Sequence, residues 1–370
     1  MTANDPISVL LFGYGLAGRI FHAPLIQAAQ GLRLDAIVTA NPERAAQARA
    51  DNPGVRIYST VDEALAGGHR LAVVGTPNVT HLPYTAAALE AGLDVVLDKP
   101  IAATAAAAHE LHLLARSAGR QLIPFQNRRW DADFRTACSV AASGALGTVH
   151  RLDSQITKMR VVGKNAWRES ADPALMGGQL YDLGAHLVDQ ALMLLGPVVG
   201  VFASARSVRN AQDADDDTTI ILEHVSGAIS RLTVSQLTAF TTPRIQLSGT
   251  RGGLRIDDYD VQEPVLVSGM RPHTGQAGID AWGDQGGFAL LRTFDDDSAM
   301  TETAVPMERG MWPAYYDGVA RCLLEGAEPP VLIDDVVSNM RVIDAARESA
   351  ATGMAIRLDP PAGHRAAAIA

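Results

Sequence analysis

The sequence has very little cysteine: Cys138 and Cys322 are the only two in 370 residues. Two cysteines cannot form the several bridges of a small disulfide scaffold, and their wide spacing does not fit a thiolate metal site. We expect both to be small buried residues in a reducing compartment. The N-terminal stretch MTANDPISVLLFGYGLAG lacks the basic region of a signal peptide, so a cytoplasmic location is the expectation.

Long apolar runs and basic clusters are also missing. No run approaches the roughly 18 apolar residues that a membrane-spanning helix needs. The formal net charge is -10, and Lys and Arg form no cluster suited to a phosphate backbone. We therefore expect a small-molecule ligand, with no nucleic-acid or membrane partner. With 47% hydrophobic and 19% charged residues, the chain should fold into two globular domains.

The first third of the sequence alternates short apolar runs with alanine-rich segments. Runs typical of buried parallel strands occur at 7–12, 32–39, 71–75, 93–97 and 121–125. Helices are expected between them at 42–50, 80–91 and 103–118. This alternation predicts an α/β domain over residues 1–124, with a doubly wound parallel sheet of the Rossmann type.

The first apolar run leads directly into Gly13-Tyr14-Gly15-Leu16-Ala17-Gly18. This GxGxxG pattern permits a tight turn and lets a pyrophosphate approach backbone N–H groups at a helix N-terminus. Glycine-rich turns are common, but one that follows the first of five such strands predicts dinucleotide binding.

The end of the second predicted strand bears on which dinucleotide is bound. NAD-binding sites usually place Asp or Glu there, whereas this sequence has Thr39, Ala40 and Asn41, followed by Arg44. The missing carboxylate, together with an arginine that could bind a 2′-phosphate, favours NADP. NAD is the alternative, because Arg44 fits a solvated helix residue almost as well.

Two further motifs follow predicted strands, at the edge where ligands of such sheets bind. They comprise Thr76, Pro77, Asn78 and His81 after the third run, and Asp98, Lys99 and Pro100 after the fourth. We expect both motifs to contact the cofactor. Pro100 favours an extended backbone at Lys99, which makes this lysine a better site candidate than an ordinary surface lysine.

Residues 125–358 show a different pattern, in which several runs alternate polar and apolar residues. These runs occupy 149–157, 198–208, 218–224, 228–236 and 244–249. They predict an α+β domain with an open, mainly antiparallel sheet that helices cover on one face. An apolar outer face would be buried most simply in a homodimer or homotetramer. Residues 359–370 are expected to be a tail.

Two segments of this half are expected to be loops. The acidic segment 213–217, with the sequence DADDD, fits a solvated loop at a strand entry. The glycine-rich segment 268–287 carries Trp282 and fits a long loop that could cover an active site.

The segment YDLGAHLVDQ, residues 181–190, places Asp182, His186 and Asp189 at i, i+4 and i+7. On a helix these side chains share one face, which is either a solvated stripe or an acid–base pair presented to a site. A zinc site at Asp182 and His186 is a further alternative, but no third ligand motif accompanies them. Asp189 is expected to be structural.

Taken together, five motifs resemble the glucose-fructose oxidoreductase, inositol dehydrogenase and MocA (Gfo/Idh/MocA) family, most closely its NADP-dependent scyllo-inositol dehydrogenase branch. In chain order they read GYGLAGRIFHAPLI, GTPNVTHLPY, DKP, QNRRWD and GGQLYDLGAHLVDQ. The resemblance implies a Rossmann cofactor domain followed by a substrate domain with an open sheet. It also implies an NAD(P)-dependent dehydrogenase that acts on CH-OH groups of a cyclic polyol or sugar.

The resemblance further implies that Lys99, Asp182 and His186 are the catalytic residues. An imidazole can exchange the hydroxyl proton near neutral pH, so His186 is the expected general acid/base. Asp182 can bind a substrate hydroxyl or orient the imidazole, and Lys99 can stabilise charge on the reacting oxygen. The sequence departs from the family at Asp98, where glutamate is commoner.

Asn127, Arg128 and Trp167 are additional candidates for substrate contacts, although an Asn in a turn or a Trp in a core is equally common. A dehydrogenase of another sugar or of a dihydrodiol is an alternative function. A second alternative is a non-catalytic dinucleotide sensor, which would have no need of the three catalytic candidates together.

Overall fold

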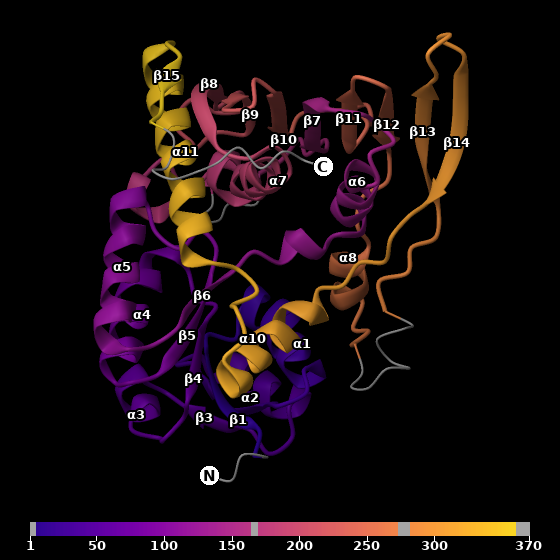
Figure 1. Ribbon diagram of the computed structural model, residues 1–370. Helices are drawn as coiled ribbons and strands as arrows, with labels where there is room; N and C mark the ends of the chain where they lie inside the picture. The colour runs from indigo at the N-terminus through magenta and orange to yellow at the C-terminus, as the bar shows by residue number, and fades with distance from the viewer. Residues whose placement is uncertain (1–4, 164–168, 273–281, 360–370) are drawn as a thin grey trace.

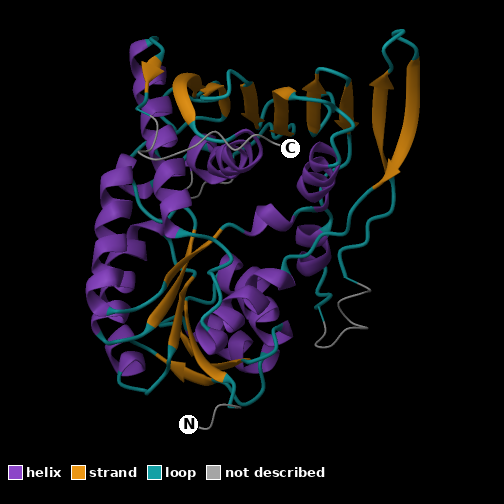
Figure 2. Ribbon diagram, in the orientation of Figure 1, coloured by secondary structure: helices purple, strands orange, loops and turns teal. Residues whose placement is uncertain are grey.

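The protein is built on two separate sheets, one in each half of the chain (Figure 1). The computed structural model describes residues 5–163, 169–272 and 282–359. The first half contains a parallel sheet between helices, and the second contains a larger, mainly antiparallel sheet (Figure 2). The predicted fold class is confirmed.

The parallel sheet has the strand order β3-β2-β1-β4-β5-β6. Its strands are β1 (Ile7–Phe12), β2 (Leu32–Val38), β3 (Arg56–Tyr58), β4 (Leu71–Val74), β5 (Asp94–Asp98) and β6 (Leu122–Phe125). The five predicted strands are therefore present. The sequence prediction missed β3, because this three-residue edge strand is only partly buried and has no apolar run to mark it.

Helices lie on both faces of this sheet (Figure 2). They are α1 (Ala23–Ala28), α2 (Pro42–Asp51), α3 (Val61–Leu65), α4 (His81–Glu90) and α5 (Ala105–Ala118). Side chains fix where they begin: Asn41 caps α2, Thr60 caps α3 and Thr104 caps α5. These caps set the directions in which the helices leave the carboxyl ends of the strands.

In the part of the chain that the structure describes, the second sheet has nine strands in the order β14-β13-β12-β11-β7-β10-β9-β8-β15. They are β7 (Val149–Thr157), β8 (Val198–Arg206), β9 (Asp217–His224), β10 (Ile229–Ser235), β11 (Ile245–Gly249), β12 (Gly252–Ile256), β13 (Phe288–Phe294), β14 (Met300–Pro306) and β15 (Ile356–Arg357). Strands β7 and β10 pair in parallel, and the other named pairs are antiparallel.

One face of the second sheet is covered by helices, and the other is open (Figure 2). Within the described residues, the α-helices of this half are α6 (Ala132–Ala142), α7 (Ala185–Leu195), α8 (Gln262–Val267), α10 (Pro313–Glu325) and α11 (Ile333–Thr352). Of these, α10 packs on α1, and α11 contacts α5 as well as α7 and β8. The last part of the chain therefore ties the two halves together.

The open face is less apolar than predicted. Phe202, Ile221 and Ile229 are exposed on it, but Arg231 on β10 forms an ion pair with Asp153 on β7 at 2.6 Å. Charged side chains thus lie in the middle of the face, because the alternating strands carry both apolar and polar residues outward.

The acidic segment 213–217 is not the solvated loop that the sequence suggests. Asp216 is buried, and its carboxylate accepts hydrogen bonds from Val208 N at 2.8 Å and from Arg209 N at 3.1 Å. The carboxylate of Asp215 accepts a bond from Leu180 N. The composition of the segment alone does not predict hydrogen bonds to N–H groups elsewhere in the chain, such as Leu180 N, which is 35 positions from Asp215.

The two cysteines and the lengths of the helices can also be compared with what the sequence predicts. Cys322 is buried, as expected, whereas Cys138 is only half-buried, and both are free thiols. Over the described residues, every helix is too short or too polar to cross a membrane.

Candidate active site

The glycine-rich loop after β1 forms a cradle that suits a dinucleotide. Gly13 has φ of 91°, and a Cβ at Gly18 would lie 2.1 Å from Gly13 O, so the turn and the close strand–helix contact both require glycine. A Cβ at Gly15 would meet nothing within 4 Å, so this residue borders open space. A pyrophosphate can approach the backbone there. Leu16 is exposed beside it, and the π-helical segment η1 begins at Ala17.

The side chain of Tyr14 is directed into the protein. Its hydroxyl donates to Asp51 Oδ2 at 3.0 Å and accepts from Asn52 Nδ2 at 2.8 Å. Burial raises the pKa of Tyr14 to about 12. This side chain braces the glycine loop against the end of α2, which leaves backbone atoms for contact with a cofactor.

The loop after β2 and the first turn of α2 hold the residues that bear on the choice of dinucleotide. Asn41 Oδ1 accepts from Arg44 N at 2.9 Å, and Asn41 N donates to Thr39 Oγ1 at 3.4 Å. The Arg44 side chain is exposed in the first turn of α2. Glu43 is exposed beside it, a nearby carboxylate that the sequence analysis did not consider.

His81 joins the two other loops at this edge of the sheet. Its ring nitrogens lie 3.0 Å from Thr76 O and 2.9 Å from Pro100 O. Asn78, which follows Pro77 in the first of these loops, donates to Leu175 O in the second half of the chain at 3.3 Å. These polar side chains therefore fix the shape of the loops by contacts within the protein.

Lys99 lies at the carboxyl end of β5 and connects the two halves. Its backbone N donates to Asp98 Oδ1 at 2.8 Å. Its ammonium group donates to Asp182 Oδ1 at 2.9 Å and to Asp182 O at 2.5 Å. The structure thus brings together two of the three predicted catalytic residues, which are 83 positions apart in the sequence.

The helix that carries Asp182 and His186 is not regular. Residues Leu180–Gly184 form a π-helical turn, η6, and the α-helix α7 begins only at Ala185. The sequence predicts one regular helix here, whereas the structure has a π-helical turn over the residues that include Asp182. A π-turn has more residues per turn than an α-helix, so the spacing of Asp182 and His186 is not that of a regular α-helix. Such turns are frequent at functional sites.

His186 is buried, with only 3% of its surface exposed. Its Nδ1 lies 3.1 Å from Gln126 Oε1, an acceptor that assigns the ring proton to Nδ1 and leaves the lone pair on Nε2. Burial, followed by the positive charges of Lys99 and Arg128, lowers the pKa of His186 well below its usual value. The imidazole is therefore neutral near pH 7 and can accept a proton.

Gln126 is a site residue that the sequence analysis missed. It lies in the QNRRWD motif, one residue before the short helix η3 (Asn127–Trp130), and it is buried. Its place directly before two predicted contact residues was the available signal. A glutamine alone carries no chemistry that would distinguish it.

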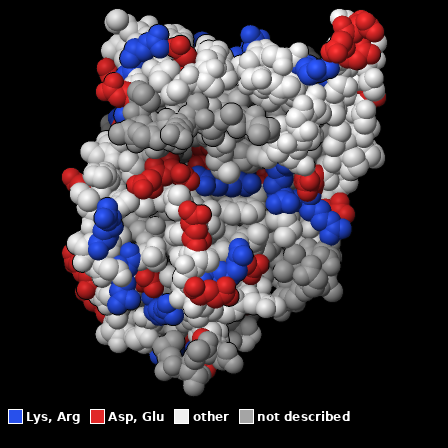
Figure 3. Space-filling view, viewed as in Figure 1, with Lys and Arg blue, Asp and Glu red and all other residues white. Residues whose placement is uncertain are grey.

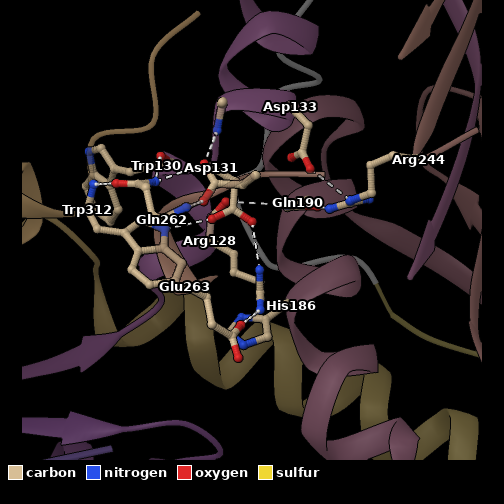
Figure 4. A network of polar contacts seen from close by, with 12 residues as sticks. Arg128, Trp130, Asp131, Asp133, His186, Gln190, Arg244, Gln262, Glu263 and Trp312 are labelled. Atoms are coloured by element: carbon tan, nitrogen blue, oxygen red, sulfur yellow. Dashed lines mark hydrogen bonds and ion pairs between the residues drawn. The ribbon is translucent and has the colours of Figure 1, made fainter. Parts of the chain in front are cut away.

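The wall of the site contains a network of charged side chains, most of which are buried (Figure 4). Arg128 pairs with Asp131 at 3.0 Å and with Glu263 at 2.9 Å. Arg244 pairs with Asp133 at 3.0 Å, and both of these side chains are 1% exposed. These contacts link η3, α6, α8 and the start of β11, so they hold the wall rigid.

Two residues of the α7 helix join this network from the other side. Gln190 accepts from Arg244 at 3.0 Å and donates to Arg128 O at 3.0 Å (Figure 4). Asp189 pairs with Arg129 at 2.7 Å, and both side chains are buried. Asp189 thus has the structural role expected of it.

Of the other two candidates for substrate contacts, the structure describes only Asn127. Asn127 is buried next to Gln126, and Trp167 lies outside the described residues. Trp282, from the glycine-rich segment, is buried and donates to Gln262 Oε1 at 2.8 Å, so it packs into the wall.

Comparisons with known proteins match this architecture along nearly the whole chain. Residues 7–126 match the model of the oxidoreductase family with an NAD-binding Rossmann fold, and residues 134–255 match the GFO/IDH/MocA C-terminal domain. The Escherichia coli protein named uncharacterized oxidoreductase YdgJ is 34% identical, and the match covers 94% of this chain and 97% of that protein. The Bacillus subtilis scyllo-inositol 2-dehydrogenase (NADP(+)) IolW is 30% identical, over 96% of this chain and 97% of that protein.

A solved structure has the same arrangement. The yvaA protein of Bacillus subtilis, described as an oxidoreductase, superposes with a TM-score of 0.90 at 29% sequence identity. The match covers 96% of this chain and 99% of that one. The chain belongs to the Gfo/Idh/MocA family of oxidoreductases, with an NAD-binding Rossmann domain followed by the family's C-terminal domain.

Proposed function

We propose that the protein is an NADP-linked dehydrogenase or reductase that interconverts a secondary alcohol and a ketone on an uncharged cyclic polyol or sugar. The observation that carries this proposal is the contact of Lys99 with Asp182, next to the neutral, buried His186. Scyllo-inositol and its ketone are the first substrates to test, because the relative IolW is named for that alcohol.

The three side chains supply what alcohol oxidation requires of a protein. The nicotinamide, when bound, accepts the hydride. His186 Nε2 carries the lone pair that removes the hydroxyl proton, and Gln126 holds the ring in that tautomer. Lys99 donates a hydrogen bond to the reacting oxygen. Asp182 fixes the Lys99 ammonium group and accepts a bond from a neighbouring hydroxyl of the substrate.

The pairing of charges favours an uncharged substrate. The arginines and the lysine of the site have carboxylate partners, in the pairs Lys99–Asp182, Arg128–Asp131, Arg128–Glu263, Arg129–Asp189, Arg129–Asp335 and Arg244–Asp133. On the face in Figure 3, basic and acidic side chains lie next to each other across the middle of the molecule. A phosphate or carboxylate would have to displace one of these partners, whereas hydroxyl groups would not.

The same contacts weigh against the alternatives. A dinucleotide sensor needs the cradle of the glycine loop but has no use for a buried neutral imidazole beside Lys99. A zinc site at Asp182 conflicts with the ammonium group that already lies 2.9 Å from its carboxylate. A dehydrogenase of another sugar or of a dihydrodiol would use the same three residues. Assays with a panel of substrates distinguish it from an inositol dehydrogenase.

Assignment of NADP as the cofactor rests on the loop after β2. Thr39 and Asn41 leave that loop without the acidic residue of NAD sites, and the exposed Arg44 can reach a 2′-phosphate. Glu43 opposes this preference, so the difference between the two dinucleotides is expected to be moderate.

We also propose that the protein forms a homodimer or homotetramer through the outer face of the second sheet. Phe288 and Phe294 on β13 are exposed there, with 63% and 45% of their surface accessible. Strands β13 and β14 lie at one edge of the sheet (Figure 1), where β13 pairs with β12 and β14 is the edge strand, and an exposed edge strand can pair with another chain. A second copy of the chain would cover both features.

The catalytic assignment predicts a large loss of turnover without loss of cofactor binding. In assays of NADPH oxidation with a panel of keto-inositols and sugars, His186→Gln should lower kcat by about 10²–10⁴-fold. Lys99→Met should lower it by about 10²-fold or more. The exposed His109→Gln is the matched control and should keep full activity. Binding of NADPH with no turnover of any compound would contradict the proposal.

The low pKa of His186 predicts the pH dependence of alcohol oxidation. The neutral imidazole is the active form, and a lowered pKa keeps it neutral as the pH falls through about 6.5, where an ordinary histidine gains a proton. The value of kcat/KM should therefore stay level down to pH 6.5 and decline only below it. A decline that begins above pH 6.5 would show that His186 is not the base in the state described here.

The cofactor assignment predicts a selective effect of Arg44→Ala. Loss of one exposed ion pair with the 2′-phosphate should weaken NADPH binding by about fivefold, roughly 1 kcal/mol, and leave NADH binding unchanged. Fluorescence titration of both dinucleotides measures this, with the exposed Arg49→Ala of the same helix as control. Tighter binding of NADH than of NADPH by the wild-type protein would reverse the assignment.

The proposed assembly predicts that a charge on the outer face releases single chains. Phe202→Glu, on β8, should shift the mass measured by light scattering from a multiple of 39.1 kDa to 39.1 kDa. The control is Leu113→Glu on α5, an apolar residue that is 50% exposed, against 42% for Phe202. A wild-type protein that is already monomeric at micromolar concentration would refute this interface.

A further inference from the structure

The chain that enters the π-helical turn η6 is held by Asp215, from the acidic segment 213–217. Asp215 Oδ2 accepts a hydrogen bond from Leu180 N at 2.9 Å, and Asp215 O accepts one from Gln179 N at 2.9 Å. Both donors lie at the N-terminal end of η6, where N–H groups have no partner within the helix. One residue therefore binds two successive N–H groups of the segment that carries Asp182.

Asp215 is itself fixed to the interior of the second sheet. The hydroxyl of Thr218 donates to Asp215 Oδ2, and Thr218 is buried at the start of β9. Because β9 lies between β8 and β10, this anchor belongs to a rigid part of the fold. Burial raises the pKa of Asp215, a cost that its hydrogen bonds partly offset.

Gly178 allows the two segments to approach this closely. Its φ is 92°, and a Cβ at this position would lie 1.9 Å from Asp215 Oδ1. Any other residue would push the carboxylate away. A second brace lies beside it, where Gln236 Nε2 donates to Gln179 Oε1 at 2.8 Å.

We propose that Asp215 is a positioning residue that fixes the start of η6, so that Asp182 meets Lys99 and the substrate in one arrangement. The expected effect of Asp215 on kcat rests on the proposed function. The expected effect of Asp215 on the stability of η6 does not. The turn η6 is only five residues long, and a lost anchor at its start lets Asp182 shift. A displacement of about 1 Å in a reacting group can lower the rate by about a hundredfold.

The test compares full-length Asp215→Ala and Asp215→Asn with Asp213→Ala, which removes an exposed carboxylate from the same loop. In Asp215→Ala, amide hydrogen exchange over residues 178–186 should become faster, and kcat should fall by about ten- to a hundredfold. The Kd of NADPH should not change, because the glycine loop is untouched. Asp215→Asn keeps an oxygen that can accept from Leu180 N, so it should restore most of the exchange protection and the turnover.

Unchanged amide hydrogen exchange over residues 178–186 in Asp215→Ala would overturn the proposal. Faster amide exchange throughout the protein, together with a normal kcat, would also overturn it. If the wild-type protein reduces no polyol or sugar ketone, the proposed function fails, and the exchange comparison still decides the role of Asp215. If Asp215→Ala does not fold, Gly178→Ala replaces it. That variant forces the same two segments apart, so unchanged local exchange in it would also overturn the proposal.

Discussion

The contact between Lys99 and Asp182 joins the two halves of the molecule at one point. Lys99 is placed by the end of β5 and by Asp98, and Asp182 by the π-helical turn before α7. Each of these two side chains depends on the other half of the chain, because the Lys99 ammonium group from the first half donates to Asp182 Oδ1 in the second at 2.9 Å. Together with the packing of α11 on α5, this contact holds the carboxyl edge of the first sheet against the helical turn that precedes α7.

Behind this contact, buried charges keep the wall of the site in one shape. Arg244 and Asp133 are almost inaccessible to water, and an unpaired charge in such a place would be costly. The network therefore resists rearrangement when a substrate enters. Burial lowers the pKa of His186 well below its usual value, and the nearby positive charges of Lys99, Arg128 and Arg244 lower it further, so the wall that encloses the ring also favours its neutral form.

Much of the first half could be predicted from the sequence because its signals are local. Apolar runs marked five of the six strands, and the glycine pattern marked the turn at Gly13 and Gly18. The short edge strand β3 gave no such signal. In the second half, strands β12 to β15 are short, exposed or interrupted, so alternation did not reveal them.

The candidate site residues stay a prediction, and they could be named from the sequence because their signals are also local. Lys99, Asp182 and His186 carry chemistry that is visible in their residue types, and the structure brings Lys99 and Asp182 into contact. The residue types of Gln126 and Asp215 do not indicate their roles. Those roles depend on His186, 60 positions from Gln126, and on Leu180, 35 positions from Asp215. The acidic segment looked solvated because the N–H groups that it binds are not neighbours in sequence.

In the proposed reaction, hydride moves between a nicotinamide and a carbon atom of a polyol or sugar at this site. The most direct measurement uses NADPH that carries deuterium at the transferable position, with mass spectrometry of the alcohol formed from a keto-inositol or sugar. The account predicts one deuterium on the new carbinol carbon with the wild-type protein and almost none with His186→Gln in the same time. An unlabelled substrate pool, from a protein that binds NADPH normally, would contradict it.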